Sequence, residues 1–243
     1  MGKWGTEWGA RHRAPLQFLG FWLSFISIVL LIIPFASLSH NPGVIKNTSW
    51  TVAKASATSI DTNSSIDLKY YIGLRMFVIS CDGDVCPQQQ THFKWTDTEC
   101  VDEFCDDCLD ATDGTITSAI LGLITMFPQI TTNMQRSAPS GDLHCQKFMG
   151  MLTSILGFVG GIYSLYSYQS GCYTNLPDTI AGYDVSYHLG PSYYCMLAAT
   201  LCKPIDFLIN LLIPVPVQGY WKQPEEEQIM TDSLIDIDVD KSY

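Results

Sequence analysis

Long uncharged apolar stretches alternate along the chain with polar segments, and four of them match the length of a membrane-spanning helix. Residues 16–35 are twenty residues without a charge, the length that one bilayer crossing requires. Residues 148–168 form a second uncharged stretch of similar length. Residues 115–132 are uncharged but rich in threonine, and residues 192–215 are apolar apart from a few polar side chains. The pattern predicts four transmembrane helices, and the apolar core of the first is longer than that of a cleaved signal peptide.

The basic residues around these stretches predict which segments face the cytosol. Lys3, Arg11 and Arg13 precede the first stretch, and Arg136 and Lys147 flank the connection between the second and the third. Lys and Arg accumulate in cytosolic loops, so these segments are expected in the cytosol. The predicted order is a cytosolic N-terminus (1–15), an extracellular loop (36–114), a cytosolic loop (133–147), a second extracellular loop (169–191) and an acidic cytosolic tail (216–243).

Two glycosylation sequons agree with this orientation. They begin at Asn47 and Asn63, both in the first extracellular loop, and the chain contains no other sequon. Glycans are attached to such sequons on surface loops of secreted segments. We interpret both asparagines as candidate glycosylation sites.

Most of the cysteines lie in the predicted extracellular loops, where an oxidising compartment favours disulfides. The six positions are Cys81, Cys86, Cys100, Cys105, Cys108 and Cys172. The spacing C-x4-C-x2-C also matches an iron–sulfur pattern, which would need a fourth thiolate and a delivered cluster. Nearby acidic residues leave calcium binding as another alternative, although no EF-hand repeat is present. We expect disulfides here, and neither a metal nor another cofactor.

The first loop also contains two strand signals. Residues 69–80 (KYYIGLRMFVIS) are rich in Tyr, Ile, Val and Phe, and residues 49–60 (SWTVAKASATSI) contain β-branched residues with partial alternation. Asp82-Gly83, between Cys81 and Cys86, is a turn signal. The predicted fold class is a membrane bundle of four α-helices with a small disulfide-linked extracellular β-sheet, formed mainly by the first loop.

Several short strings resemble the claudin superfamily, which also includes the peripheral myelin protein and calcium-channel gamma subunits. Residues 16–23 (LQFLGFWL) are similar to the opening of a claudin first helix, and residues 187–199 (YHLGPSYYCMLAA) to the entry into the fourth. The family's tryptophan–glycine–leucine–cysteine–cysteine signature is matched by Trp50, Gly73, Leu74, Cys81 and Cys86. The resemblance implies the same four-helix fold and a first disulfide between Cys81 and Cys86.

The chain departs from the family pattern at several points. Arg75 stands where the family usually has a tryptophan after Gly-Leu, and four of the cysteines are additional. The last three residues, Lys241-Ser242-Tyr243, do not resemble the claudin PDZ-binding terminus. We interpret the chain as a divergent member of the superfamily.

Two further motifs fall inside the apolar stretches. Lys203 and Asp206 share a helix face in the fourth, where they can form an ion pair inside the bundle. Alternatively the helix ends near Cys202 and leaves Lys203 at the cytosolic surface, or the charges mark a transport path or a channel contact. In the third stretch, Gly157 and Gly161 form a G-x-x-x-G motif, which indicates helix packing inside the bundle or a dimer face.

The sequence contains no nucleophile elbow, phosphate-binding loop or HExxH motif, so neither catalysis nor a nucleic-acid partner is expected. The first loop instead carries five basic and twelve acidic residues, a net charge of −7. Asp82, Asp84, Asp97 and Glu99 are candidates to line a narrow aqueous path, where their field would favour cations.

Two functions remain open. The resemblance implies a plasma-membrane protein of cell–cell contacts, whose extracellular loops associate in cis and in trans to form or regulate a paracellular barrier or a cation-favouring path. The alternative is an auxiliary, gamma-like subunit that contacts an ion channel or a receptor within the lipid membrane. A transporter is the least supported possibility, because only one charged pair lies within the predicted spans.

Overall fold

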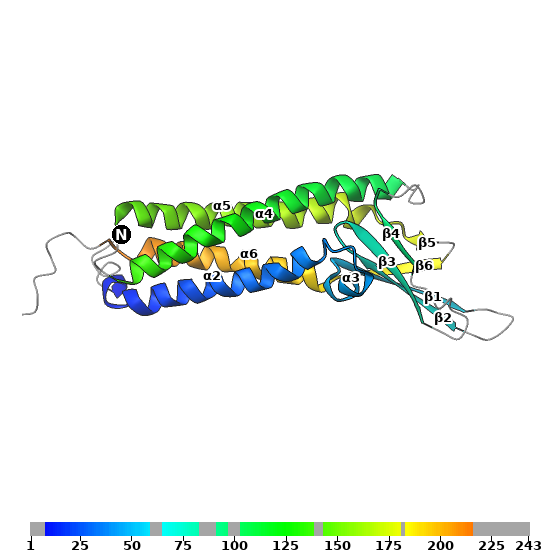
Figure 1. Ribbon diagram of the computed structural model, residues 1–243, viewed down its shortest axis with the longest axis horizontal. Coiled ribbons are helices and arrows are strands. Elements are labelled where there is room, and N and C mark those ends of the chain that lie inside the picture. The colour runs from blue at the N-terminus through cyan, green and yellow to red at the C-terminus, as the bar shows by residue number, and fades with distance from the viewer. Residues whose placement is uncertain are drawn as a thin grey trace, which may run out of the picture.

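The computed structural model describes residues 8–58, 65–82, 91–96, 103–138, 143–180 and 183–215 of the chain. Four long helices form an elongated bundle with a sheet at one end (Figure 1). They are α2 (Arg13–Ala36), α4 (Glu103–Ser137), α5 (His144–Gly171) and α6 (Pro191–Leu212). Each is long and apolar enough to cross a membrane, which confirms the four predicted spans as helices and indicates a multi-pass membrane protein.

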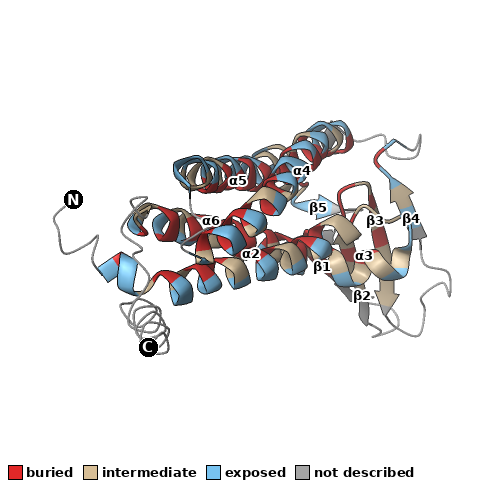
Figure 2. Ribbon diagram, turned by 60° about the vertical axis from the view of Figure 1, so that its left-hand side comes forward, coloured by how far each residue is buried: buried red, intermediate tan, exposed pale blue. Residues whose placement is uncertain are grey.

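The bundle exposes apolar side chains and buries many polar ones. Figure 2 shows exposed and buried positions alternating along the helices. Phe18 of α2, Phe127 of α4 and Val159 of α5 are each more than half exposed, whereas Gln129 and Ser154 are fully buried. A water-soluble bundle would show the opposite pattern. Lipid tails are as apolar as these side chains, so such a bundle is held together by close packing and hydrogen bonds between helices.

α4 begins twelve residues before the predicted start of the second span at residue 115. Its first two turns contain Cys105 and Cys108, so this part of the predicted first loop is helical. Asp106 and Asp107 are favourable in these turns because their charges balance the positive end of the helix dipole. The apolar pattern missed this part of the helix because five of the twelve residues that form it are acidic.

A six-stranded antiparallel sheet lies at one end of the bundle, and both loops contribute to it. The first loop supplies β1 (Thr51–Thr58), β2 (Ser65–Ile72), β3 (Met76–Asp82) and β4 (Thr91–Lys94), and the second supplies β5 (Thr179–Ile180) and β6 (Tyr183–Leu189). The strand order is β4-β3-β2-β1-β6-β5, so β6 pairs with β1. The small sheet formed mainly by the first loop is therefore confirmed.

The short helix α3 (Pro42–Thr48) packs against one face of this sheet. Ile45 of α3, fully buried, contacts Met76 and Val78 of β3. Asn41 caps the helix by accepting a hydrogen bond from the backbone of Gly43 at 2.9 Å. The opposite face of the sheet buries the small side chains of β1 beneath tyrosines, so both faces contribute to packing.

The glycines of the G-x-x-x-G motif face the interior of the bundle. A Cβ atom on Gly157 would lie 2.7 Å from Oγ1 of Thr125 on α4 and 2.8 Å from Cε of Lys203 on α6. Gly161 is similarly close to the side chain of Thr200 on α6. The motif is therefore used for packing between α5 and its neighbours within the chain, as one of the two interpretations predicted.

We predict that Gly157→Ala destabilises the bundle by about 1–3 kcal/mol, because the added methyl group overpacks a closed contact. Gly122→Ala is the matched control, since its Cβ would lie 4.0 Å from the nearest atom, a carbonyl oxygen. The control should be neutral or slightly stabilising, because alanine favours helix over glycine. Thermal unfolding of the purified proteins in detergent measures both effects, and equal melting temperatures for the two variants would contradict the assignment.

Candidate functional site at the sheet end and in the bundle core

Trp50 lies where the sheet meets the helix bundle. Its side chain is fully buried and its indole Nε1 donates to Oγ of Ser37 at 2.9 Å. The ring packs against Tyr168 of α5, with centroids 4.8 Å apart, and edge-on against Tyr193 of α6. Its backbone carbonyl accepts from the amide of Gly190, just before α6. This one residue therefore connects the first strand with both α5 and α6.

Two other residues of the claudin-like signature pack close to Trp50. Gly73 donates its backbone N–H to the carbonyl of Met76 at 2.9 Å, closing the tight connection between β2 and β3. A Cβ atom on Gly73 would lie within 3.1 Å of Ile45 and of the carbonyl oxygens of Met76 and Ser37, so glycine is the only residue that fits without rearrangement. Leu74 is 2% exposed in the same core as Trp50. Trp50, Gly73 and Leu74 therefore form the joint between sheet and bundle.

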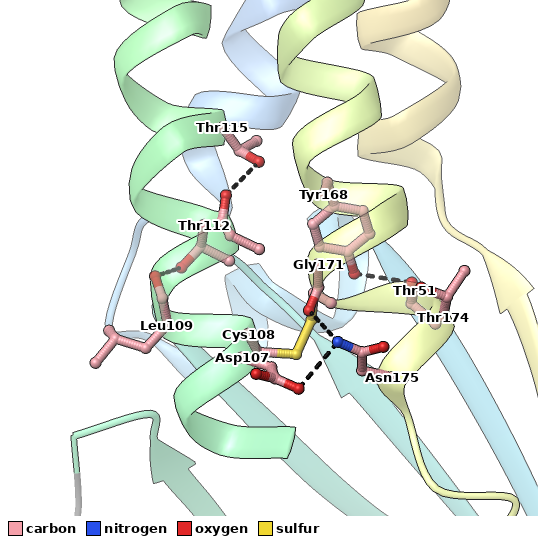
Figure 3. The surroundings of a disulfide bond; sticks show 12 residues. Thr51, Asp107, Cys108, Leu109, Thr112, Thr115, Tyr168, Gly171, Thr174 and Asn175 are labelled. Atoms are coloured by element: carbon pink, nitrogen blue, oxygen red, sulfur yellow. Dashed lines mark hydrogen bonds between the residues drawn. A yellow bond between two sulfur atoms is a disulfide. The ribbon is translucent and has the colours of Figure 1, made fainter. Parts of the chain in front are cut away.

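A disulfide between Cys108 and Cys172 links the start of α4 with the end of α5 (Figure 3). Beside it, Asn175 donates to the carboxylate of Asp107 at 2.9 Å and to the carbonyl of Gly171 at 3.2 Å. The hydroxyls of Tyr168 and Thr51 lie 2.8 Å apart, which joins α5 to β1. The first loop and the second loop are thus covalently linked as well as paired in the sheet.

Two further cysteines, Cys81 and Cys105, are also disulfide-bonded. Cys86 and Cys100 lie outside the described residues, so the predicted pairing of Cys81 with Cys86 stays a prediction. Within the described part of the chain, no group of three or more His, Cys, Asp or Glu side chains could hold a metal ion.

The other predicted sites of the first loop are only partly described. Asn47 lies exposed in the last turn of α3, where its amide donates to the carbonyl of Gly43. Asn63, Asp84, Asp97 and Glu99 lie outside the described residues, and only the backbone of Asp82, in β3, is described. The glycosylation sites and the acidic path stay predictions.

Arg75, which replaces a tryptophan of the family pattern, forms an ion pair with Asp113 of α4 at 3.1 Å. Both side chains are well exposed, at 41% and 60%, so water screens the pair and its contribution to stability is small. The contact nevertheless orients the turn after β2 toward α4.

Tyr187 fixes the second loop against the sheet. Its hydroxyl donates to the backbone carbonyl of Pro177, ten residues earlier. Burial, together with the nearby charge of Asp178, raises the pKa of Tyr187 to about 12. The hydroxyl therefore stays protonated, and remains a donor, at any physiological pH.

Lys203 and Asp206 are both buried within α6, at 2% and 1% exposure, which excludes the interpretation that the fourth helix ends near Cys202. Among the described residues no direct salt bridge joins the two side chains, although their charges interact along α6, so the predicted ion pair stays a prediction. Lys203 instead donates to Oε1 of Gln129 on α4 at 3.0 Å. Asp206 accepts from Ser24 of α2 at 2.7 Å and from Asn133 of α4 at 3.2 Å. Both charges therefore contact α4, and Asp206 also contacts α2.

The polar core continues from Asp206 toward the end of the bundle opposite the sheet. Asn210 of α6 donates to the carbonyl of Asp206 at 2.9 Å and accepts from Arg136 of α4. Arg136 also donates to the carbonyl of Ile213, and Lys147 of α5 donates to that same carbonyl, at 3.0 and 3.1 Å. The two cations thus satisfy carbonyl groups that α6 leaves free at its carboxyl end.

These partners were missed by sequence reasoning, although their spacing carries a signal. Gln129, Asn133 and Arg136 recur at helical intervals in an otherwise apolar stretch, and so do Gln17 and Ser24 on α2. Gln17 is fully buried, and neither amide atom has a hydrogen-bond partner among the described residues. Polar residues on one face of a membrane helix indicate where that helix contacts its neighbours.

No known protein-family model matches the sequence, and comparison with curated proteins finds no match. The resemblance to the claudin superfamily therefore stays a prediction from the sequence.

We predict that replacing both Cys108 and Cys172 by serine lowers the free energy of unfolding by about 4 kcal/mol. The disulfide closes a segment with a sequence separation of 64 residues, and closing a long loop restricts the unfolded chain strongly. Unfolding under non-reducing conditions measures the effect, and peptide mapping of the wild-type protein should recover the Cys108–Cys172 link. The matched control is Cys145→Ser, because Cys145 is a free, exposed cysteine.

We also predict that Asp206→Ala costs about 3 kcal/mol, because Ser24 and Asn133 then lose a buried acceptor. Leu208→Ala is the control on the same helix, since Leu208 is 50% exposed on the outer surface of the bundle. The melting temperatures of the two variants in detergent provide the comparison. An Asp206→Ala protein as stable as Leu208→Ala would show that the polar core is dispensable.

Proposed function

We propose that the chain is a claudin-like integral membrane protein of cell–cell junctions, whose extracellular sheet associates in cis and in trans. The observation that carries the proposal is a single sheet, built from both loops and fixed to the bundle by Trp50, Gly73 and Leu74. A sheet fixed in this way can transmit an external contact to the membrane, which a flexible loop cannot do.

The position of the basic residues supports a cytosolic location for the end of the bundle opposite the sheet. Arg13, Arg136 and Lys147 all lie at that end, where α2 and α5 begin and α4 ends (Figure 1). The positive-inside bias then puts the sheet outside the cell. Asn47, exposed on α3 beside the sheet, would be accessible to the glycosylation machinery in that orientation.

Two inner strands of the sheet, β1 and β6, offer a surface for association. Lys54 of β1 lies directly opposite Ser186 of β6 in register, and Val52 opposite His188. Because partners in register share a face, the exposed side chains of Lys54, Ser186 and His188 form one polar surface across the two loops. We propose that this surface contacts neighbouring copies, while the net charge of −7 on the first loop favours cations along any path between them.

The first experiment is fluorescence imaging of sparse mixed cultures, with two differently tagged versions in cells that lack junctional strands. We expect enrichment only where two expressing cells touch. Lys54→Glu combined with His188→Glu should reduce this enrichment, because it adds negative charge to a surface that meets an already acidic loop. Leu208→Ala, on the outside of the bundle, is the matched control and should behave as the wild type.

A glycan on Asn47, detected by a glycosidase-sensitive mobility shift, serves as the delivery control. A uniform surface signal from a correctly glycosylated protein would contradict self-adhesion. Co-purification of an ion channel or receptor in that case would favour the auxiliary-subunit alternative.

A further inference from the structure

A surface groove lies between α4 and α5 near the disulfide, with a volume of about 310 Å³. The described residues that line it include Asp107 and Asp110 of α4, Tyr163, Tyr166 and Ser170 of α5, and Asn175. Tyr163, Tyr166 and Ser170 recur at helical spacing, so they form one stripe along α5. Neither the fold nor the proposed junction function accounts for this combination of carboxylates and exposed aromatic rings.

The height of the groove matches the lipid headgroups. Lys147 marks the opposite end of α5, and Tyr166 follows it by nineteen residues, roughly 28 Å along a helix. This distance is close to the roughly 30 Å thickness of the hydrocarbon layer. Exposed apolar side chains, Val159 and Ile162, lie one turn before Tyr163 and Tyr166 on the same face of α5. The groove is therefore continuous with the lipid-facing surface.

The electrostatic character of the groove favours a cation. Asp107 and Asp110 are exposed, and the described lining residues include no basic side chain. The carboxyl end of α5, at Gly171, adds partial negative charge that offsets the positive end of the α4 dipole, so the two carboxylates set the sign of the groove. Arg75, which approaches α4 from the sheet, is engaged with Asp113. One carboxylate oxygen of Asp107 accepts from Asn175, which holds that carboxylate in place.

The two tyrosine rings in the groove favour an organic ammonium group over a metal ion. Tyr163 and Tyr166 are 56% and 65% exposed, so their ring faces are available to a ligand. Quaternary ammonium groups are recognised by such faces together with carboxylates, because they carry a diffuse charge and donate no strong hydrogen bond. A metal ion would instead need a set of three or more ligand side chains, which the described residues do not provide.

We propose that this groove binds the choline headgroup of a phosphatidylcholine molecule in the adjacent leaflet. The ammonium group lies between the carboxylates of Asp107 and Asp110 and the rings of Tyr163 and Tyr166. The acyl chains follow Val159 and Ile162 down the outer surface of α5. The inference rests on the four helices crossing a membrane and is independent of any cell–cell contact.

Native mass spectrometry of the full chain in detergent tests the proposal. The probes are dioleoyl phosphatidylcholine and dioleoyl phosphatidylglycerol, which share the same acyl chains and phosphate but differ in that only the first carries a quaternary ammonium group. We expect the protein to retain the choline lipid preferentially. Asp107→Asn combined with Asp110→Asn should lower this retention at least about fivefold, because two exposed carboxylates each contribute a modest attraction.

Matched variants distinguish lipid binding in the groove from effects of overall charge or of folding. Asp106→Asn removes a neighbouring exposed carboxylate that does not line the groove, and should leave retention unchanged. Tyr166→Phe keeps the ring and should retain the lipid, whereas Tyr166→Leu should not. If the double variant fails to fold, Asp110→Asn alone is the test, since the side chain of Asp110 forms no hydrogen bond or ion pair among the described residues.

Equal retention of the two lipids would overturn the proposal, as would an equal loss in Asp106→Asn. Binding of a calcium ion with no lipid would also overturn it. Recovery of the Cys108–Cys172 link in each variant confirms that a lost lipid does not reflect a lost fold. Because these measurements use isolated protein, a failure of cell–cell enrichment does not affect them.

Discussion

A carboxylate in the middle of a membrane bundle must be hydrogen-bonded by the helices around it, and this requirement organises the structure. Asp206 meets it by accepting from Ser24 of α2 and Asn133 of α4, which fixes the rotation of three helices about their axes. Gly20 makes the arrangement possible, because a Cβ there would lie 2.8 Å from the carboxylate of Asp206. Small residues and polar residues are thus complementary: the glycines provide the space that the buried polar side chains occupy.

The sheet depends on a second set of contacts at the other end of the helices. Trp50, which directly precedes β1, is hydrogen-bonded to Ser37 and packed against Tyr168. The start of β1 is therefore fixed to α5 and to the segment after α2. At the same end of the bundle, the Cys108–Cys172 disulfide joins the start of α4 to the end of α5. A sheet attached to a bundle at several points behaves as a continuation of the helices, which is what an adhesive surface on a membrane protein requires.

The sequence contained enough information to predict the four spans and the β-structure around residues 49–60 and 69–80, because both are encoded in local periodicity. It also indicated that Gly157 lies at a helix contact, either inside the bundle or in a dimer. The first turns of α4 could not be predicted in this way, because their acidic residues interrupt the apolar pattern. The hydrogen-bond partners of Lys203 and Asp206 were missed for a related reason. Their spacing on α6 places them on one face, but which partner each finds is decided by Gln129, Ser24 and Asn133 on other helices. The groove between α4 and α5 likewise exists only once the two helices are side by side.

The position of β6 beside β1 sets an order for assembly during synthesis. β1 to β4 emerge from the ribosome together, but β1 keeps one open edge until residues 183–189 have been made. Two further helices are synthesised in that interval. An unpaired edge strand is a template for other chains, so the nascent protein passes through a period in which a neighbouring copy or a chaperone can occupy the place of β6. The last helix to be made, α6, follows β6 directly, and its insertion therefore coincides with the closing of the sheet.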